Sequence, residues 1–251
     1  MRLRYRATLA YDGSAYAGFQ RQKAGTSTIQ GAVESVLEQL ARHPVTVFAS
    51  GRTDSGVHAS GQVIAFDLAW RHSELQLLRA LNALLPEDIA LQTLQETRAD
   101  FHPRFDALAR VYEYSIVNAG MRQPLWLRRA WQVFDELDVD ALRQAAALLV
   151  GKHDFGAFGQ APQGNNTVRR IVRSCWTREP LRRGQLLRYR VEGNAFLYHM
   201  VRRMVGMQVD LARGRLDLAA FEQIFRSGDL SQAGTLAPAR GLVLLEVRYA
   251  D

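Results

Sequence analysis

The chain has 251 residues, which is enough for one large domain or for two modest domains that each bury a core. It contains no run of about 18 apolar residues, so we expect no membrane span. Its basic N-terminus enters a strand pattern without an apolar signal region, which predicts a cytoplasmic location. The net charge of +7, from 32 basic and 25 acidic residues, favours a polyanionic partner.

Cysteine and histidine content limits the metal and redox chemistry that the chain can support. Cys175 is the only cysteine, which excludes an intramolecular disulfide and a thiolate metal cluster. The six histidines include no helical pair beside an acid, which the zinc-protease motif requires. We therefore expect no metal and no cofactor.

The first half of the chain shows the periodicities of four strands and two helices. Alternation predicts a strand over 3–11, and an apolar stripe predicts a helix over 29–40 with Ser27 and Gln30 as its capping box. A second helix over 77–85 follows a Ser73 and Gln76 capping box and stops at Pro86. Further strands are predicted over 45–50, 61–68 and 89–94. The order β-α-β-β-α-β is typical of a ferredoxin-like unit, an antiparallel sheet with both helices on one face.

The second half resembles an elaborated copy of this order. A helix capped by Asp138 and a longer helix ending at Gly214 are its main helical signals, with a short helix around Phe221. Strands are predicted over 110–117, 130–134, 168–177, 185–192 and 242–249, and the glycine-rich stretch 156–166 predicts a mobile loop. The sequence thus predicts an α+β protein of two ferredoxin-like halves, residues 1–105 and 106–251, joined around a central cleft.

The segment Gly51-Arg52-Thr53-Asp54-Ser55-Gly56-Val57-His58 lies between two predicted strands. Its glycines let the backbone turn sharply and let a ligand approach closely. The Arg52 guanidinium can hold Asp54 ionised or bind a phosphate. The spacing alone equally allows a hairpin loop in which Asp54 bonds its own backbone.

This segment resembles the signature loop of the TruA family of tRNA pseudouridine synthases, and the resemblance runs from Tyr11 to about Tyr249. It implies the pseudouridine synthase fold, with Asp54 as the nucleophile that isomerises uridine to pseudouridine in the tRNA anticodon stem-loop. The family acts at positions 38, 39 and 40, uses no cofactor or metal, and is usually homodimeric. Whether Asp54 attacks the ribose C1′ or the uracil ring stays open.

The resemblance implies two further substrate-binding residues besides Arg52. Tyr112 matches the family tyrosine that stacks on the flipped uracil, whereas its residue pattern alone favours a core aromatic; Tyr114 is predicted to be structural. Arg202 completes the family pattern Asn-x-Phe-x-x-x-Met-Val-Arg over 194–202, in which the arginine pairs with the catalytic aspartate. Its place off the apolar stripe of the helix alone favours a solvated surface.

The resemblance also implies contacts to RNA outside the reacting base. Phe19, Gln20, Arg21 and Gln22 match a family Trp-Gln-Arg-Gln segment that inserts into RNA, with Phe19 replacing the tryptophan. His58 is expected to be structural or to contact RNA, and Arg104, in Phe101-His102-Pro103-Arg104-Phe105, to contact a phosphate. An arginine-rich surface is the last candidate, formed by Arg169, Arg170, Arg173, Arg182, Arg183, Arg188 and Arg190.

Three other readings compete with this one. Asp54-Ser55-Gly56 equals the aspartic-protease triplet, but that chemistry needs two such triplets, so a dimer would have to supply the second. Ferredoxin-like sheets with exposed aromatics also occur as non-catalytic RNA-binding modules. Gly51 and Gly56 have the spacing of a phosphate-binding loop, but Val57-His58 replaces its Lys-Ser/Thr, which excludes that motif.

Overall fold

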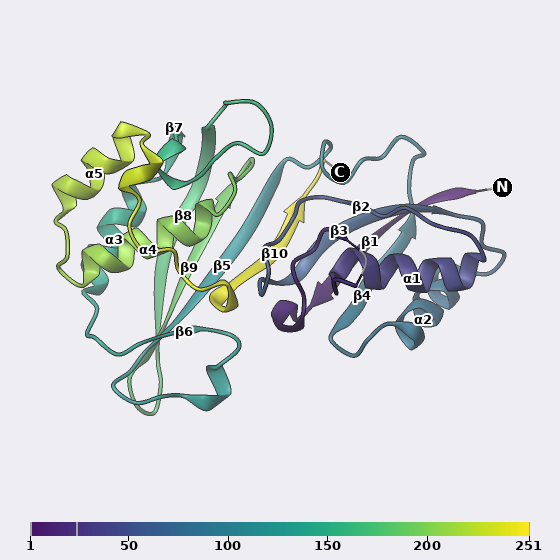
Figure 1. The fold of residues 1–251 in the computed structure, drawn as a ribbon, viewed down its shortest axis with the longest axis horizontal. Coiled ribbons are helices and arrows are strands. Elements are labelled where there is room, and N and C mark those ends of the chain that lie inside the picture. Colours follow the sequence, from purple (N-terminus) through teal and green to yellow (C-terminus); the bar gives the residue numbers. More distant parts are fainter. Residues whose placement is uncertain (1, 24, 251) are drawn as a thin grey trace. The chain divides into compact units, whose positions relative to one another are not determined.

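The computed structural model describes residues 2–23 and 25–250 and shows a mixed α+β protein with mostly antiparallel strands, which confirms the predicted class (Figure 1). The chain divides into two compact units. Unit 1 contains the residues up to Leu108 together with those from Val243 on, and unit 2 contains Ala109–Leu242. Unit 1 therefore takes its last strand from the far end of the sequence.

Unit 1 is a sheet with two helices. Its strands follow the order β4-β1-β3-β10, with the short β2 paired to β3. β1 runs antiparallel to both β3 and β4, whereas β10 runs parallel to β3, with Val243 opposite His58. The elements are β1 (Leu3–Tyr11), η1 (Gly13–Ala15), α1 (Ile29–Ala41), β2 (Phe48–Ala49), β3 (His58–Leu68), α2 (Glu74–Leu84), β4 (Ile89–Glu96) and β10 (Leu242–Arg248).

The alternation predicted for the first strand is present in β1. Tyr5, Ala7 and Leu9 are buried, and the residues that alternate with them, including Arg4 and Arg6, lie on the other face and are only partly buried. The two helices contribute the apolar stripes that periodicity predicted, and the buried members are Ile29, Val33, Val36, Leu37, Leu77 and Leu81. Period-2 and period-3.6 patterns thus account for the part of this core that β1, α1 and α2 contribute.

Two local predictions in unit 1 are wrong and one is confirmed. The N-cap of α1 is Thr28, whose side chain accepts from the Gly31 N–H, not Ser27. The strand predicted over 45–50 shrinks to β2, because the Val47 N–H donates 3.0 Å to the Glu34 carboxylate instead of joining the sheet. The Ser73 and Gln76 capping box of α2 is present as predicted.

Unit 2 has a sheet of order β5-β9-β8-β7, with β6 parallel to β5. Asp138 caps α3 as predicted, whereas β7 was not predicted. The elements are β5 (Ala109–Asn118), η2 (Pro124–Trp126), β6 (Trp131–Val133), α3 (Val139–Leu148), β7 (Gly151–Asp154), η3 (Gly156–Phe158), β8 (Val168–Pro180), β9 (Gln185–Gly193), α4 (Met200–Ala212), α5 (Leu218–Ser227), η4 (Leu230–Gln232) and η5 (Ala239–Gly241).

One face of the unit 2 sheet forms its core. Tyr114, Tyr189 and Trp176 lie side by side across β5, β9 and β8 in the strand register, and all three are buried. The start of the predicted mobile loop also belongs to this core, which corrects that prediction. Phe158 in η3 is fully buried and packs 5.6 Å, ring to ring, from Phe225 of α5.

Candidate functional site

The loop that carries Asp54 lies in unit 1 and is fixed by main-chain hydrogen bonds. The Phe19 N–H donates 3.0 Å to the Thr53 carbonyl, and the Gly56 N–H donates 3.4 Å to the Tyr16 carbonyl. Within the loop, the Val57 N–H donates 3.1 Å to the Asp54 carbonyl and closes a turn. The backbone of Asp54 is therefore held on both sides while its side chain stays partly exposed.

Two glycines outside the loop allow this close support. A Cβ at Gly18, whose φ is +98°, would lie 2.9 Å from the Thr53 carbonyl oxygen and 3.3 Å from the Asp54 carbonyl carbon. A Cβ at Gly13 would lie 2.0 Å from the Val57 carbonyl oxygen. Sequence reasoning identified the glycines inside the loop and missed these two, because a close approach across the fold leaves no local signal.

Phe19 and His58 are internal supports of the loop. The Phe19 ring is only 2% exposed and lies 6.2 Å, centroid to centroid, from Tyr11, whose hydroxyl bonds the Thr53 hydroxyl at 2.7 Å. His58 is 3% exposed; its Nδ1 accepts 3.1 Å from the Gly13 N–H and lies 3.1 Å from an Asp12 oxygen. Both rings are buried in this structure and support the Asp54 loop, which is one of the two roles expected of His58.

The remaining predicted residues of unit 1 lie at the surface. Arg52, Gln20, Arg21 and Gln22 are exposed, and Arg21 forms a 2.9 Å ion pair with Glu34. The structure therefore brings the segment 19–22 against the Asp54 loop through Phe19 while its polar members face solvent. A polar surface beside a held carboxylate is suited to bind a polar substrate.

Tyr112 lies on β5 in unit 2 and is partly exposed. The Phe196 ring meets it edge to face, with centroids 5.0 Å apart and an interplanar angle of 81°. Tyr114, two residues along the same strand, is fully buried and donates 2.7 Å to the Pro238 carbonyl, and burial raises its pKa well above the ordinary range. Only Tyr112 of this pair has a ring that a ligand can reach.

Arg202 lies in the first turn of α4, and main-chain contacts fix it. Its Nε–H donates 2.8 Å to the Ala237 carbonyl, and its own carbonyl accepts 3.2 Å from the Ala237 N–H. One turn along, a Cβ at Gly206 would lie 1.6 Å from the Thr235 carbonyl oxygen. The buried Asp210 carboxylate accepts from the Thr235 N–H and hydroxyl, so the segment 235–237 is fastened along the helix.

The residue before α4 adopts an unusual backbone conformation. His199 has φ 62° and gives the helix no side-chain capping bond. Its ring stacks on Tyr198 at 3.7 Å, and Tyr198 is 59% exposed. Left-handed conformations at residues other than glycine cost about 1–3 kcal/mol and concentrate at functional sites. This strain marks the start of α4, just before Arg202, as a second region of interest.

Two arginines of the surface predicted to bind RNA already have hydrogen-bond partners within unit 2. Arg188 on β9 forms ion pairs with Glu113 at 2.9 Å and with Glu179 at 3.1 Å. Burial lowers the pKa of Arg169, and its guanidinium donates to the Asn166 and Val168 carbonyls. These two arginines serve the fold of unit 2 as well as its surface charge.

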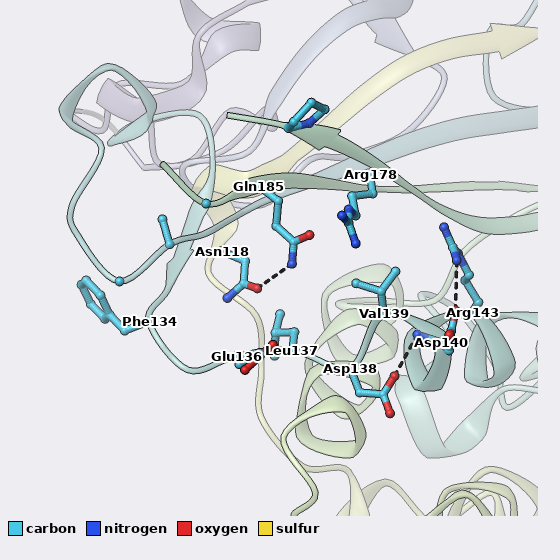
Figure 2. Close-up of a pocket in the computed structure, with 14 residues that line it drawn as sticks. Asn118, Phe134, Glu136, Leu137, Asp138, Val139, Asp140, Arg143, Arg178 and Gln185 are labelled. Carbon is cyan, nitrogen blue, oxygen red and sulfur yellow. Dashed lines mark hydrogen bonds and ion pairs between the residues drawn. The ribbon is translucent and has the colours of Figure 1, made fainter. Parts of the chain in front are cut away.

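A pocket of about 660 Å³ in unit 2 contains none of the predicted site residues (Figure 2). Its wall mixes the carboxylates of Glu136, Asp138 and Asp140 with the guanidinium groups of Arg143 and Arg178, so it offers no uniformly positive surface to a polyanion. Asp138 caps α3, and Asp140 pairs with Arg143 at 3.0 Å, so both serve the helix. Across residues 2–23 and 25–250, no cluster of three or more His, Cys, Asp or Glu is arranged to hold a metal ion, and no helix is long and apolar enough to span a bilayer.

A family model described as tRNA pseudouridine synthase matches residues 7–106 and 145–250 of this chain. The chain belongs to the tRNA pseudouridine synthase family. The match includes Asp54 and Arg202, whereas Tyr112 falls between its two segments. Among solved structures, one assigned as a chlorite dismutase covers 85% of this chain and 88% of its own at 15% identity, but its TM-score of 0.21 carries no argument.

Curated relatives extend this family match over nearly the whole chain. A tRNA pseudouridine synthase A from Myxococcus xanthus is 43% identical over 249 residues, covering 99% of this chain and 92% of that protein. Proteins of the same name from Neisseria meningitidis serogroup B and Brevibacillus brevis are 39% and 40% identical; they cover 99% and 98% of this chain, and the matches span 92% and 99% of those proteins. Identity at this level and coverage places both units within the family.

Proposed function

We propose that this chain converts uridine to pseudouridine in the anticodon stem-loop of tRNA, at positions 38, 39 and 40. The observation that carries the proposal is the family match over both units, which makes the chain an isomerase that acts on tRNA. The net charge of +7 suits a polyanionic substrate. The choice of the anticodon stem-loop rests on the resemblance of the Asp54 loop.

Asp54 is the nucleophile in this proposal. The N1–C1′ glycosidic bond of the target uridine breaks, the uracil turns, and a new bond forms between C5 and C1′. The proton leaves C5 and N1 gains one, so the reaction is a balanced isomerisation that consumes no co-reactant. A carboxylate can form a transient covalent bond in such a sequence. A partly exposed side chain on a backbone fixed at Thr53 and Gly56 supports this role.

In this proposal Tyr112 binds the target base and Arg202 positions Asp54. The target base must leave its stack before it can react, and an aromatic ring then provides its stacking partner. The partly exposed Tyr112 ring, held by Phe196, supports that role. Arg202 pairs with Asp54 as the resemblance implies, and the Ala237 carbonyl that orients its guanidinium supports a positioning function.

The finer architecture belongs to the same proposal. The order β4-β1-β3 with β2 on β3, with a helix after β1 and after β3, supports a ferredoxin-like first half, residues 1–105. The second half, residues 106–251, is proposed as an elaborated copy, and the homodimer and the cytoplasmic location rest on the resemblance. Arg52 is a further proposed substrate-binding residue. The proposed RNA-binding region consists of Phe19, Gln20, Arg21, Gln22, His58 and Arg104, in which the buried Phe19 and His58 act as supports.

Tritium release from tRNA that carries 5-tritiated uridine tests this function. Wild-type protein should release tritium, and Asp54→Ala should release none while binding tRNA within a few-fold of wild type. Asp100→Ala, at an exposed acid of the same unit, is the matched control and should keep full activity. Wild-type binding without release would identify a non-catalytic RNA-binding protein, and pseudouridine mapped only outside 38–40 would contradict the proposed target.

A further inference from the structure

An aromatic array lies on the face of the unit 1 sheet opposite its buried stripe. Phe48 of β2 is in register with Ala65 of β3, which is in register with Arg6 of β1, so Phe48 shares the face of Arg4 and Arg6. The His102 ring lies 5.6 Å from Phe48, and the Phe105 ring lies 4.3 Å from His102. Phe48, His102 and Phe105 together form the array.

The outer member of the array is unusually exposed. Phe105 is 73% exposed, although one face of its ring rests on His102. The Arg104 guanidinium lies 5.6 Å from the centroid of the same ring. An exposed ring that packs on other rings beside a cation is part of a surface cluster and not a single scattered apolar residue, which makes it a candidate contact for a ligand.

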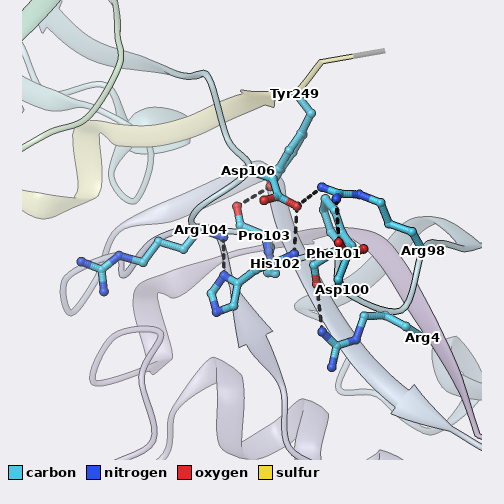
Figure 3. A network of polar contacts seen from close by, with 9 residues as sticks. All are labelled: Arg4, Arg98, Asp100, Phe101, His102, Pro103, Arg104, Asp106 and Tyr249. Atoms are coloured by element: carbon cyan, nitrogen blue, oxygen red, sulfur yellow. Dashed lines mark hydrogen bonds and ion pairs between the residues drawn. The ribbon is translucent and has the colours of Figure 1, made fainter.

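A dense polar network holds the segment that carries this ring (Figure 3). The His102 N–H donates 3.0 Å to the Asp106 carboxylate, and the Asp106 N–H donates back to the His102 carbonyl at 3.0 Å. The Arg104 N–H donates 3.2 Å to His102 Nδ1, and the Tyr249 hydroxyl donates 2.7 Å to the Pro103 carbonyl. The turn is therefore rigid before anything binds, which lowers the entropy cost of recognition.

The array also lies within reach of the proposed nucleophile. Phe48 precedes Asp54 by six residues in the same unit, and a chain spans at most about 3.6 Å per residue. Their Cα atoms are thus within roughly 22 Å of each other. An RNA strand is long enough to reach both places.

We propose that Phe105, supported by His102, is a stacking platform for an unpaired nucleobase of the RNA substrate, with Arg104 beside it for the adjoining phosphate. The proposal rests on the proposed function and adds a second base-binding site, separate from Tyr112. A ring that is 73% exposed and packed on His102 offers the flat partner that every base can use, and a neighbouring guanidinium attracts the backbone.

Binding of an unmodified anticodon stem-loop RNA at fixed salt tests the platform. Phe105→Ala should weaken binding about 5- to 150-fold, the equivalent of 1–3 kcal/mol per stacked base. Phe105→Tyr should restore binding, and Leu75→Ala, which removes a 53%-exposed apolar side chain of α2 in the same unit, should leave it unchanged. The melting temperature and the kcat at saturating RNA should stay near wild type in all three.

Two further measurements separate a base contact from other roles. Phe105→Ala should leave the dependence of binding on salt unchanged because no charge is lost, whereas Arg104→Gln should reduce that slope by about one. Single abasic substitutions along the RNA should include one that weakens wild-type binding but adds nothing to Phe105→Ala. That non-additivity identifies the base.

The proposal is overturned if Phe105→Ala binds RNA within two-fold of wild type. It is also overturned if that variant loses self-association, measured by sedimentation, while its RNA affinity is unchanged, because the ring then contacts protein. If wild-type protein binds RNA but releases no tritium, the proposed function fails while the platform stands on its binding data.

Discussion

The Nε–H of Arg202 donates a 2.8 Å hydrogen bond to the carbonyl oxygen of Ala237. This bond fixes the plane of the guanidinium from the main chain, so the group is oriented before substrate arrives. A lysine has a single ammonium group and no planar guanidinium, so it cannot donate this hydrogen bond to the main chain and also present a planar pair of donors.

Arg202→Ala should therefore lower kcat by at least about 100-fold, the lower end of the effect of removing one preorganised charge-stabilising donor. Arg202→Lys should recover only part of that loss. The free energy of unfolding should fall by only about 1 kcal/mol, the value of one lost hydrogen bond. Arg203→Ala, one residue along α4, is the control and should retain activity. A near-wild-type rate for Arg202→Ala would remove this residue from the site.

Gly206 lets the segment 235–237 pack closely on α4, and this segment carries Ala237, whose carbonyl accepts the hydrogen bond from Arg202. A Cβ at Gly206 would lie 1.6 Å from the Thr235 carbonyl oxygen, so Gly206→Ala must push the segment 235–237 off the helix. We expect a loss of roughly 1–3 kcal/mol in unfolding free energy and a fall in kcat as Arg202 loses its orientation. Gly120→Ala, where a Cβ meets nothing within 4 Å, should change neither quantity. Full activity in Gly206→Ala would show that the segment is not needed to orient Arg202.

Tyr112 and Tyr114 should separate function from folding. Tyr112→Ala should raise the KM for tRNA with little effect on the melting temperature, because its ring is partly exposed and is the proposed stacking partner of the target base. Tyr112→Phe keeps the ring and should keep the KM. Tyr114→Phe loses the bond to the Pro238 carbonyl and should cost about 1 kcal/mol of stability with unchanged kinetics. The opposite pattern would exchange the two roles.

The sequence predicted those elements whose signals are local. Ser73 with Gln76 and Asp138 mark helix starts through residues three positions away or fewer, and β1 shows its buried face by simple alternation. Predictions failed where a side chain distant in the sequence determines the local structure. Glu34 diverts the backbone of Val47, and Phe158 enters the core because α5 supplies Phe221 and Phe225.

The candidate site shows the same division. Asp54 stands out in a contiguous motif, so one chain segment is enough to find it. Its supports do not: Gly18 matters only because the Thr53 carbonyl lies against it, and Ala237 only because Arg202 reaches its carbonyl. Contacts between residues more than thirty positions apart leave no spacing pattern in a single sequence.

Asp67 should give unit 1 part of its resistance to acid. Two hydrogen bonds of 2.7 Å from Arg4 lower the pKa of Asp67 below its ordinary value of 3.8. Because the pKa of Asp67 is lower in the folded state than in the unfolded state, its ionised form stabilises the fold at any pH above the unfolded-state pKa. This stabilisation is lost as the pH falls through the folded-state pKa. The side chain is 43% exposed, so the contribution at neutral pH should be under about 1 kcal/mol.

Urea denaturation of Asp67→Asn against wild type between pH 2 and 7 measures this contribution. The stability difference should be present at pH 7 and should shrink as pH falls below 3.8 and through the lowered pKa of Asp67, because protonated Asp67 and the asparagine that replaces it are both neutral. Asp100→Asn, whose side chain is 77% exposed beside Arg98, should show a smaller difference. If the stability difference persists unchanged to pH 2, the stabilisation by Asp67 comes from its shape and not from its charge.

Replacing Arg42 with glycine should stabilise the protein, whereas the same exchange inside a helix should destabilise it. Arg42 ends α1 with φ 60°, a left-handed conformation that costs a residue with a Cβ about 1–2 kcal/mol. Arg42→Gly should relieve that cost and, after the larger entropy loss of glycine on folding, stabilise the protein by about 0.5–1 kcal/mol. Arg79→Gly, the same exchange at an exposed position inside α2, should destabilise it by a similar amount because glycine disfavours helix interiors. Chemical denaturation should therefore move the two midpoints in opposite directions, and a shared direction would show that the positive φ at Arg42 carries no strain.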